Sequence, residues 1–577
     1  MSPGSLLCIL LSSALQESIL AAHDEMFLLQ TKLEMRASHG DKSGITSAEK
    51  SVELKGEADV VSSNVSQPEE RNTASSTGIS ASKQKTQKRN VLFIIADDVT
   101  PSMISTLDAD ASHMHTPHIN ALVTESLVLK NSHAQQALCA PSRASVLFGR
   151  RPDTMHVWDA SQTAQLRNYC KTCKTIPELF KDAGYYTVGM GKVFDDGGGG
   201  EVLPAEVQQD PQSWSDPAFA GDNWFYGTTN ESHDFSWESV NESANGPLQD
   251  SQVRDHAVSW LRALTARNTT QPWFLAVGFR KPHLPFTCPD EFYNLYSVND
   301  IQLASNPFAP PDMPPIAWTY QEILKWNDVK ATAYTGAINE TLNECKAKEL
   351  VRGYQACVSY HDHNVGTILN ELKALGHWND TIIAFWSDHG FKVGQHGGWA
   401  KGMNTHLDTS APVILRVPGL TEGDRGVVSD ALVEHVDLMA TLLDAAGLNL
   451  PGLCSEKQSW KTNYCTEGHS FLKLASNPNT TWKNSSFSQV NRDSMRYMGY
   501  SMNTNMKLRF TAWVDFDNET LTTDFGMTGE NCGFELYNHT EDPFENVNLA
   551  YQNSSKNLVQ ELFMQLKLGW RATHTLL

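Results

Sequence analysis

The chain has 577 residues, of which 40% are hydrophobic and 19% charged, and it contains 15 Trp and 23 Phe. This composition is typical of a folded globular protein, and the lack of any apolar stretch of about 18 residues excludes a multispan membrane protein. Lysine and arginine number 45 against 66 aspartate and glutamate, a net charge of −21, so a basic surface for nucleic acid is not expected. A polyanionic ligand would have to meet a local cluster of cations.

The first 22 residues are predicted to be a signal peptide. An apolar core at Leu6–Leu11 is followed by small residues at Ala21 and Ala22, although the usual basic start is missing. A short buried helix is the alternative. Eleven Asn-x-Ser/Thr sequons, spread from Asn64 to Asn553, favour an exported glycoprotein. We therefore expect the secretory pathway, with a lysosomal or secreted destination and no membrane span.

Residues 23–88 are predicted to be a disordered linker or propeptide. Most of this segment is poor in bulky apolar side chains and rich in Ser, Lys, Glu, Gln and Thr. Such a composition cannot bury enough apolar surface to offset the entropy cost of ordering the chain.

The cysteines fit an oxidising compartment. Without the one in the signal peptide and Cys139, which is considered below, eight remain, an even number. Cys454 and Cys465 close a short loop and are the disulfide we expect most. The pair Cys170 and Cys173 could form half of a zinc site or a redox motif, but no second Cys-x-x-Cys exists to complete a zinc site. A structural disulfide is therefore favoured there.

Beyond the predicted linker, the first strongly apolar run starts directly after Asn90. Val91–Ala96 is uninterrupted by polar residues, which is typical of a parallel strand buried on both faces. It ends in Asp97 and Asp98, where open α/β sheets bind ligands. Two adjacent acids repel each other unless a cation lies between them, so a metal site is one interpretation and an Asp turn with a helix cap is the other.

A second segment repeats this pattern. Thr381–Trp386 is another apolar strand, and Ser387-Asp388-His389-Gly390 follows it. If both strands lie centrally in one sheet, three carboxylates and one imidazole converge at one edge. Oxygen-rich sites of this kind suit a hard cation such as Ca²⁺ or Mg²⁺, whereas a two-zinc site would need more histidines.

A third segment carries a candidate nucleophile. Cys139-Ala-Pro-Ser-Arg143 lies at a predicted helix start, where backbone N–H groups favour an anion. Ser142 is expected to cap the helix and Arg143 to fork onto an oxyanion. The thiol of Cys139 is either a reactive thiolate or half of a disulfide.

These motifs together resemble the type I, formylglycine-dependent sulfatase family, and within it the iduronate 2-sulfatases. The resemblance extends from Asn90 to the C-terminus, and its Cys motif is highly specific when acids precede and follow it. The matching segments are Asp97-Asp98, Cys139-Ala140-Pro141-Ser142-Arg143, Gly149-Arg150-Arg151-Pro152-Asp153-Thr154, Lys281-Pro282-His283, Ser387-Asp388-His389-Gly390 and Trp399-Ala400-Lys401.

The resemblance implies a cofactor and a modification. In this family the cysteine at the position of Cys139 is oxidised by a formylglycine-generating enzyme to an aldehyde whose hydrate is the nucleophile. It also implies one Ca²⁺ per chain. The ligands it assigns are Asp97, Asp98, Asp388, His389 and formylglycine 139.

The resemblance also implies roles around the sulfate group. Arg143, Lys192 and Lys401 would supply fixed positive charge, and such a donor is typically worth about 10²–10³ in rate. His283 would contact the sulfate and protonate the leaving alcohol. The implied substrate is a sulfated polysaccharide or glycosaminoglycan.

Two positions depart from the family pattern. Phe148 replaces the usual Thr before Gly149, which is peripheral to the Cys motif. Asp195 stands where the family has the histidine that acts as a base after sulfate transfer. A carboxylate is a weaker base than imidazole, so Asp195 either takes over this role more slowly or merely pairs with Lys192.

We expect an α/β fold, an alkaline-phosphatase-like α/β/α sandwich over residues 89–475. A smaller C-terminal α+β subdomain is expected over 476–577, with strands at 506–515 and 534–537 and a helix at 557–568. The leading interpretation is an exo-acting sulfatase. A phosphoester hydrolase of the same superfamily and a secreted glycan-binding pseudo-sulfatase remain alternatives. Specificity is expected in the loops at 195–250 and 300–345.

Overall fold

The computed structural model describes residues 88–195, 209–215, 234–267, 269–421, 426–454, 459–526 and 532–573. The description below concerns the unit formed by residues 88–577. The predicted signal peptide at 1–22 and the predicted linker lie outside the described residues, except for Lys88 at the end of the linker.

Seven strands form the central sheet, in the order β10-β2-β9-β8-β1-β6-β4. Four of them, β4, β6, β1 and β8, are parallel, and β9 runs antiparallel to both β8 and β2. Every residue of β1 is buried, as expected for a strand covered on both faces. The strands are β1 Asn90–Ala96, β2 Leu127–Leu129, β4 Tyr186–Gly191, β6 Trp273–Gly278, β8 Thr381–Ser387, β9 Val413–Arg416 and β10 Val427–Ser429.

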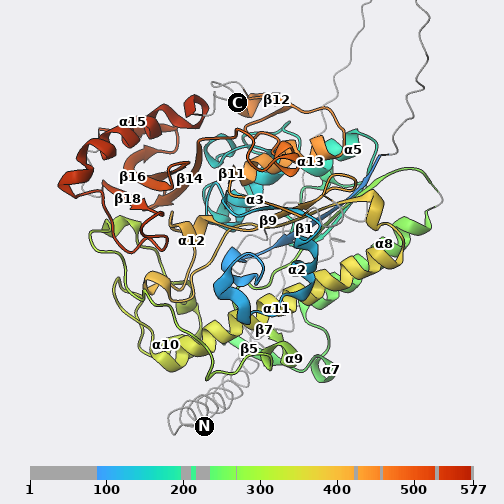
Figure 1. Cartoon of the computed structure of the whole chain (residues 1–577), viewed down its shortest axis with the longest axis horizontal. Helices are drawn as coiled ribbons and strands as arrows, with labels where there is room; N and C mark the ends of the chain where they lie inside the picture. Colours follow the sequence, from blue (N-terminus) through green and yellow to red (C-terminus); the bar gives the residue numbers. More distant parts are fainter. Residues whose placement is uncertain are drawn as a thin grey trace, which may run out of the picture. The chain divides into compact units, whose positions relative to one another are not determined.

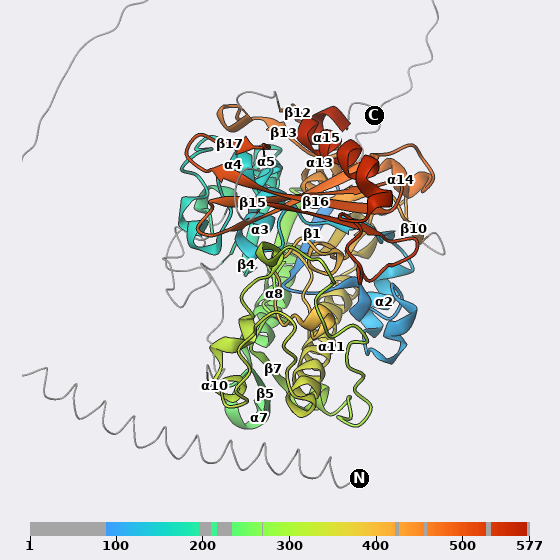
Figure 2. The same ribbon diagram turned by 90° about the vertical axis from the view of Figure 1, so that its left-hand side faces the viewer.

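Helices cover both faces of this sheet (Figures 1 and 2). One layer contains α3, α5 and α13, and the other contains α2, α8 and the long helix α11. This confirms the expected α/β/α sandwich. The bounds are α2 Pro117–Val123, α3 Cys139–Phe148, α5 Ile176–Asp182, α8 Gln249–Ala266, α11 Glu344–Ala374 and α13 Leu438–Ala445.

A second, antiparallel sheet follows in the chain. Its order is β14-β15-β16-β17, and β18 pairs with β16 at Leu508–Trp513, beside the stretch that pairs with β17. The predicted strands at 506–515 and 534–537 are β16 and β18, and the predicted helix at 557–568 is α15, which packs on the sheet (Figure 1). The bounds are β14 Ser485–Arg492, β15 Tyr497–Thr504, β16 Leu508–Asp517, β17 Thr522–Asp524, β18 Gly533–Asn538 and α15 Lys556–Thr573.

Shorter elements complete the described part of the chain. Three two-stranded sheets pair β3 with β11, β5 with β7, and β12 with β13. Their strands are β3 Ser132–His133, β5 Trp237–Val240, β7 Phe286–Pro289, β11 Val433–Glu434, β12 Gly452–Leu453 and β13 Cys465–Thr466. The short helices are α4 Pro152–Met155, α7 Glu242–Asn245, α9 Asp290–Tyr293, α10 Asn327–Lys330, α12 His406–Thr409 and α14 Lys473–Ser476. None of the helices among the described residues is both long and apolar enough to cross a bilayer.

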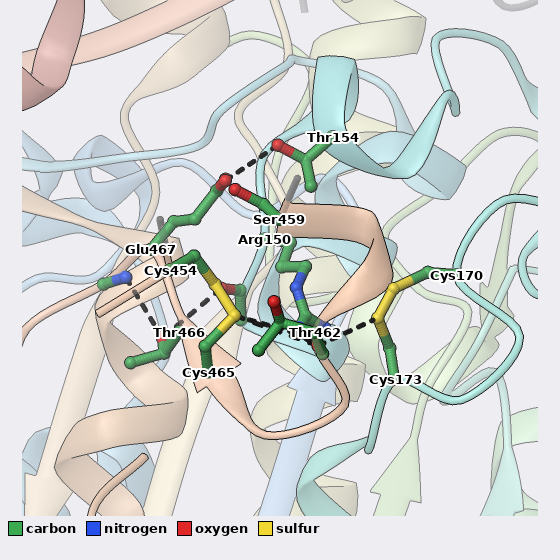
Figure 3. The surroundings of a disulfide bond; sticks show 12 residues. Arg150, Thr154, Cys170, Cys173, Cys454, Ser459, Thr462, Cys465, Thr466 and Glu467 are labelled. Carbon is green, nitrogen blue, oxygen red and sulfur yellow. Dashed lines mark hydrogen bonds between the residues drawn. A yellow bond between two sulfur atoms is a disulfide. The ribbon is translucent and has the colours of Figure 1, made fainter. Parts of the chain in front are cut away.

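Two disulfides lie close together (Figure 3). Cys454 pairs with Cys465, as predicted, and Cys170 pairs with Cys173. The carbonyl oxygen of Thr462 lies 3.9 Å from a sulfur of each disulfide and accepts a hydrogen bond from the Arg150 guanidinium. Cys454–Cys465 therefore closes this loop, and Arg150 ties the loop to the residues that follow α3.

Candidate active site

Two strand ends supply the acidic part of the site. β1 and β8 are adjacent and parallel, with Ala96 opposite Ser387, so the residues that follow them meet at one edge of the sheet. The backbone N–H of Asp98 donates a hydrogen bond to Asp388 Oδ1 over 3.2 Å. Asp98 has a φ of 71°, a conformation that aspartate adopts more readily than most residues. The predicted convergence of the two strand ends is confirmed.

Helix α3 places a thiol beside these acids. Cys139 is the first residue of α3, and its Sγ lies 3.4 Å from Asp97 Oδ1 and 3.4 Å from Lys401 Nζ. Asp97, Asp98, Cys139 and His389 are buried, and each offers one ligand atom within 4.8 Å of the others. We call these four residues the acidic cluster.

Ser142 does not cap α3, contrary to expectation. The helix begins at Cys139 with Leu138 as its N-cap, so Ser142 is already in the first turn. Its hydroxyl donates to the carbonyl oxygen of Asp388 over 2.5 Å. Ser142 therefore ties α3 to the end of β8.

Three cations surround the cluster. Lys192 Nζ lies 2.6 Å from Asp97 Oδ2, and Lys401 Nζ lies 2.8 Å from Asp98 Oδ1. Arg143, which is fully buried, donates from Nε to Asp388 Oδ2 over 2.9 Å and also reaches the carbonyl oxygen of Lys192. Its guanidinium is thus held by the carboxylates and backbone of the site.

Burial and these charges shift the pKa values in opposite directions. Burial alone would raise the pKa of Asp97, but Lys192 and Arg143 hold it well below its ordinary value. Burial keeps the pKa of Asp98 well above its ordinary value despite Lys401. Burial, reinforced by Asp97, also raises the pKa of the Cys139 thiol well above its ordinary value. An unmodified Cys139 is therefore a thiol at neutral pH, which disfavours the thiolate nucleophile.

The donor set fits a metal ion. His389 Nε2 is buried and makes no hydrogen bond, and His389 Nδ1 lies 3.2 Å from Asp98 Oδ1. Burial lowers the pKa of His389, which leaves the imidazole neutral and able to coordinate. Asp388 adds a third carboxylate beside this histidine, with its Oδ2 3.6 Å from His389 Nε2.

His283 and Asp195 also lie at this site. His283 Nδ1 is 2.6 Å from the carbonyl oxygen of Leu284, so this nitrogen carries a proton and donates it. Burial, and then Lys401, lower the pKa of His283 well below its ordinary value. Asp195 is buried with Oδ1 3.4 Å from Lys192 Nζ. The structure therefore brings every predicted site residue to one region, while their chemical roles are a separate question.

Two residues of the site were not predicted. The Tyr354 hydroxyl, from α11, donates to the carbonyl oxygen of Asp98 over 2.6 Å and fixes this strained residue. Burial raises the pKa of Asp98, and Glu322, in a 3₁₀ turn at Glu322–Lys325, adds to this rise. Burial would lower the pKa of Lys401, but Asp98 raises it, and Glu322 adds to that effect. No motif marks Tyr354, whereas Glu322 falls within the 300–345 loop in which specificity was expected.

Comparisons with known proteins agree with this geometry. A sequence model of the family described as Sulfatase matches residues 89–448. The chain is 33% identical over 532 residues to human iduronate 2-sulfatase, covering 83% of this chain and 94% of the human protein. The mouse iduronate 2-sulfatase is also 33% identical, with 83% and 93% covered. A choline-sulfatase of Rhizobium meliloti is 26% identical over 63% of this chain and 69% of the bacterial protein.

Solved structures show the same fold at low identity. One was determined in complex with its substrate D-glucosamine-2-N,6-O-disulfate. It has a TM-score of 0.59 and 19% identity, covering 83% of this chain and 96% of the other. A phosphonate monoester hydrolase from Silicibacter pomeroyi gives a TM-score of 0.59 and 18% identity, covering 84% and 96%. The fold alone therefore does not separate sulfur from phosphorus chemistry.

Proposed function

The chain belongs to the sulfatase family and is a sulfuric ester hydrolase, and from this premise we propose that it removes sulfate from sulfated glycans with a formylglycine made from Cys139 and one bound Ca²⁺. The observation that carries the proposal is the position of Cys139. Its sulfur lies between Asp97 and Lys401 at the start of α3. A raised thiol pKa makes cysteine itself a poor nucleophile there, whereas an aldehyde hydrate would be a reactive one.

The same modification explains the choice of metal. With Cys139 as a thiol, the acidic cluster mixes a soft sulfur with carboxylate oxygens and an imidazole. Formylglycine replaces the sulfur by oxygen, and the set of Asp97, Asp98, Asp388 and formylglycine then suits a hard cation, with His389 alongside. When bound, Ca²⁺ would supply Lewis acidity to the oxygens at residue 139 and to the sulfate.

The lysines are proposed to receive the sulfate group. Lys192 and Lys401 are nearly fully buried and approach the cluster from different segments of the chain. A sulfate ester entering beside Cys139 would bring negative charge to these two ammonium groups, in a site where water is largely excluded. We assign Arg143 mainly to holding Asp388 and Asp97, because its donors are already used there.

His283 is proposed to handle the proton of the leaving alcohol. Its Nδ1–H is committed to Leu284, so Nε2 is the nitrogen available to the reaction. Without substrate, burial and Lys401 keep the imidazole neutral. A bound sulfate anion favours the imidazolium, so we expect His283 to gain its proton together with substrate, which would suit an acidic compartment.

The substrate class and compartment follow from several weaker observations. The identity to iduronate 2-sulfatases makes a 2-sulfated uronic acid at a chain end the first substrate to test. The sequons and the two disulfides support the secretory pathway, with a lysosomal or secreted product. Modification by a formylglycine-generating enzyme during synthesis completes the proposal, and the division into 89–475 and 476–577 is kept as a prediction.

Hydrolysis of a chromogenic aryl sulfate, measured beside the matching aryl phosphate, tests this function. We expect the sulfate to be the better substrate and Cys139→Ala to lower its turnover by at least about 10³, because the nucleophile is lost. Cys532→Ala, in the C-terminal sheet region, is the matched control and should keep wild-type turnover. A preference for the phosphate would support a phosphoester hydrolase, and inactivity on both would support a pseudo-sulfatase.

A further inference from the structure

A cavity of about 250 Å³ lies where α4, β14, β15 and the end of α15 meet. No residue of the acidic cluster lines it. Its volume corresponds to about eight water molecules, enough for one sugar ring with its substituents. Tyr500, Phe525 and Trp570 in its wall are each partly exposed, so the cavity opens to the surface.

Cations dominate the lining. Arg151, Lys567 and Arg571 face the cavity together with a single carboxylate, Asp153. The carboxylates that balance the arginines, Glu434 and Glu467, are not part of the lining. The lining itself thus presents more cationic than anionic side chains, and the exposed Lys567 is the cation that an anionic group of a ligand would meet first.

Hydrogen bonds and ion pairs hold two charged side chains of the cavity wall in place before any ligand binds. Arg151 is 5% exposed, both ends of its guanidinium bind Glu434, and its Nε–H makes no hydrogen bond. Asp153 accepts hydrogen bonds from Tyr500, Gln489 and Trp158, so its charge is largely satisfied. A ligand would therefore meet side chains that are already ordered, with little repulsion from Asp153.

An aromatic platform accompanies these charges. Two guanidinium groups lie within cation–π distance of the Trp570 ring, with its centroid 4.5 Å from Arg151 Cζ and 4.0 Å from Arg571 Cζ. Tyr500 and Phe525 add a second, stacked aromatic pair with centroids 6.5 Å apart. Flat apolar rings beside fixed donors suit the C–H face of a sugar.

Residues near the Cys454–Cys465 disulfide form hydrogen bonds with side chains of the cavity wall. Glu467 accepts hydrogen bonds from Thr154, from the Arg151 backbone and from Arg571, and it lies two residues beyond Cys465 (Figure 3). The Arg571 side chain also donates to Ser459 in the same disulfide-anchored segment. Hydrogen bonds to Glu467 and Ser459 thus hold Arg151 and Arg571 in place before a ligand binds.

We infer that this cavity binds an anionic sugar unit of a polymeric glycan, separately from the acidic cluster. The inference rests on the proposed function for the identity of the polymer. A sulfate or carboxylate of that unit would lie near Arg151 and Lys567, with the ring against Trp570. When this cavity holds one sugar unit of a glycan, the effective concentration of that glycan's other units at the active site rises.

Calorimetric titration of the full chain carrying Cys139→Ala with a heparin-derived octasaccharide tests the inference, because binding is then measured without turnover. We expect Lys567→Glu to weaken binding about fivefold, since Lys567 is exposed and its loss removes one charge contact without unfolding the chain. Trp570→Leu should weaken it as well. Lys556→Glu, at the other end of the same helix and outside the cavity, is the matched control and should leave binding unchanged.

Two results would overturn the inference. One is equal octasaccharide affinity in Lys567→Glu and Lys556→Glu. The other is equally tight binding of a desulfated, uncharged oligosaccharide of the same length to the unaltered cavity. With Cys139 intact, Lys556→Glu should keep wild-type turnover of an aryl sulfate. A wild-type protein without aryl sulfate turnover would count against the proposed function. The comparison of octasaccharide affinities would still show whether the cavity binds the glycan.

Discussion

Asp195 is the site residue whose predicted role as a base most needs a direct test. Its carboxylate lies 3.4 Å from Lys192 Nζ, while the same ammonium group lies 2.6 Å from Asp97. The shared lysine places Asp195 at the margin of the acidic cluster, where it can act either as a base or only as a partner of Lys192. The contact with Lys192 is compatible with both roles, so a kinetic experiment has to separate them.

Asp195→Ala is expected to lower kcat on an aryl sulfate by about 10²–10³, because a general base contributes on this scale. If the base acts only after the alcohol has left, the variant should release a burst of about one alcohol per enzyme molecule and then stall. Rapid-quench measurement of the released phenol checks this. Asp182→Ala, an exposed acid at the end of α5, is the control. Wild-type turnover in Asp195→Ala would rule out the base and leave only the ion pair.

Among individual site residues, the sequence identifies those that follow a recognisable strand or lie in a specific motif. Asp97 and His389 are examples, because the direction of parallel strands determines where their ends meet. Tyr354 could not be predicted, since it comes from the middle of a long helix and acts through its hydroxyl on the backbone of Asp98. The predicted cap at Ser142 is wrong because the helix begins at Cys139, and the Ser142 hydroxyl binds the carbonyl oxygen of Asp388 instead.

The ends of β4 and β6 show how closely the elements must approach to build the site. Gly278 ends β6, and its carbonyl oxygen accepts a hydrogen bond from the backbone N–H of Lys192 over 2.9 Å. A Cβ on Gly278 would lie 2.0 Å from the carbonyl oxygen of Lys192 and 2.5 Å from the backbone nitrogen of Val193. The lysine can therefore reach Asp97 only if position 278 has no side chain.

Gly278→Ala is expected to lower the free energy of unfolding by about 1–3 kcal/mol, because backbone must move to admit the methyl group. The displaced Lys192 should also reduce aryl sulfate turnover. Urea unfolding and steady-state kinetics on the same preparation measure both effects. Gly452→Ala serves as the control, since a Cβ there meets no atom within 4 Å. Equal stability and turnover in the two variants would contradict this account of the strand ends.

Helices and strands with a strong apolar pattern could be predicted from the sequence. Close contacts between elements, such as that between Gly278 and Lys192, could not. The runs at 91–96 and 381–386 and the helix at 557–568 are periodic or uniformly apolar, and the structure confirms them as β1, β8 and α15. Helix α15 continues to Thr573 through a break at Gly569, whose φ of 77° is not helical. That break brings Trp570 to the cavity, a tertiary effect that no local pattern indicates.

In the whole molecule, the acidic cluster joins segments far apart in the chain. Its four residues come from the ends of β1 and β8 and from the start of α3. Without a cation, the carboxylates of Asp97, Asp98 and the neighbouring Asp388 face only the positive charges of the two lysines and Arg143. A bound Ca²⁺ would thus connect the core of the sandwich and stabilise the folded chain by mass action.

Saturating Ca²⁺ is therefore expected to raise the unfolding temperature, with about 3 kcal/mol of added stability at a concentration 100 times the Kd. Differential scanning calorimetry with Ca²⁺ and with a chelator measures the shift. Asp98→Asn should lose most of the response, while Asp493→Asn, an exposed acid outside the site, should keep it. No calcium response, together with two zinc ions found by metal analysis, would favour the phosphoester alternative.

Peptide mass spectrometry of residue 139 tests the central claim most directly. Active protein made in a cell that contains the formylglycine-generating enzyme should carry an aldehyde at this position. The peptide would then have lost one sulfur and two hydrogens and gained one oxygen relative to its unmodified form. Sulfatase activity should rise with the modified fraction across preparations. A preparation that hydrolyses the aryl sulfate while Cys139 is entirely unmodified would contradict the account.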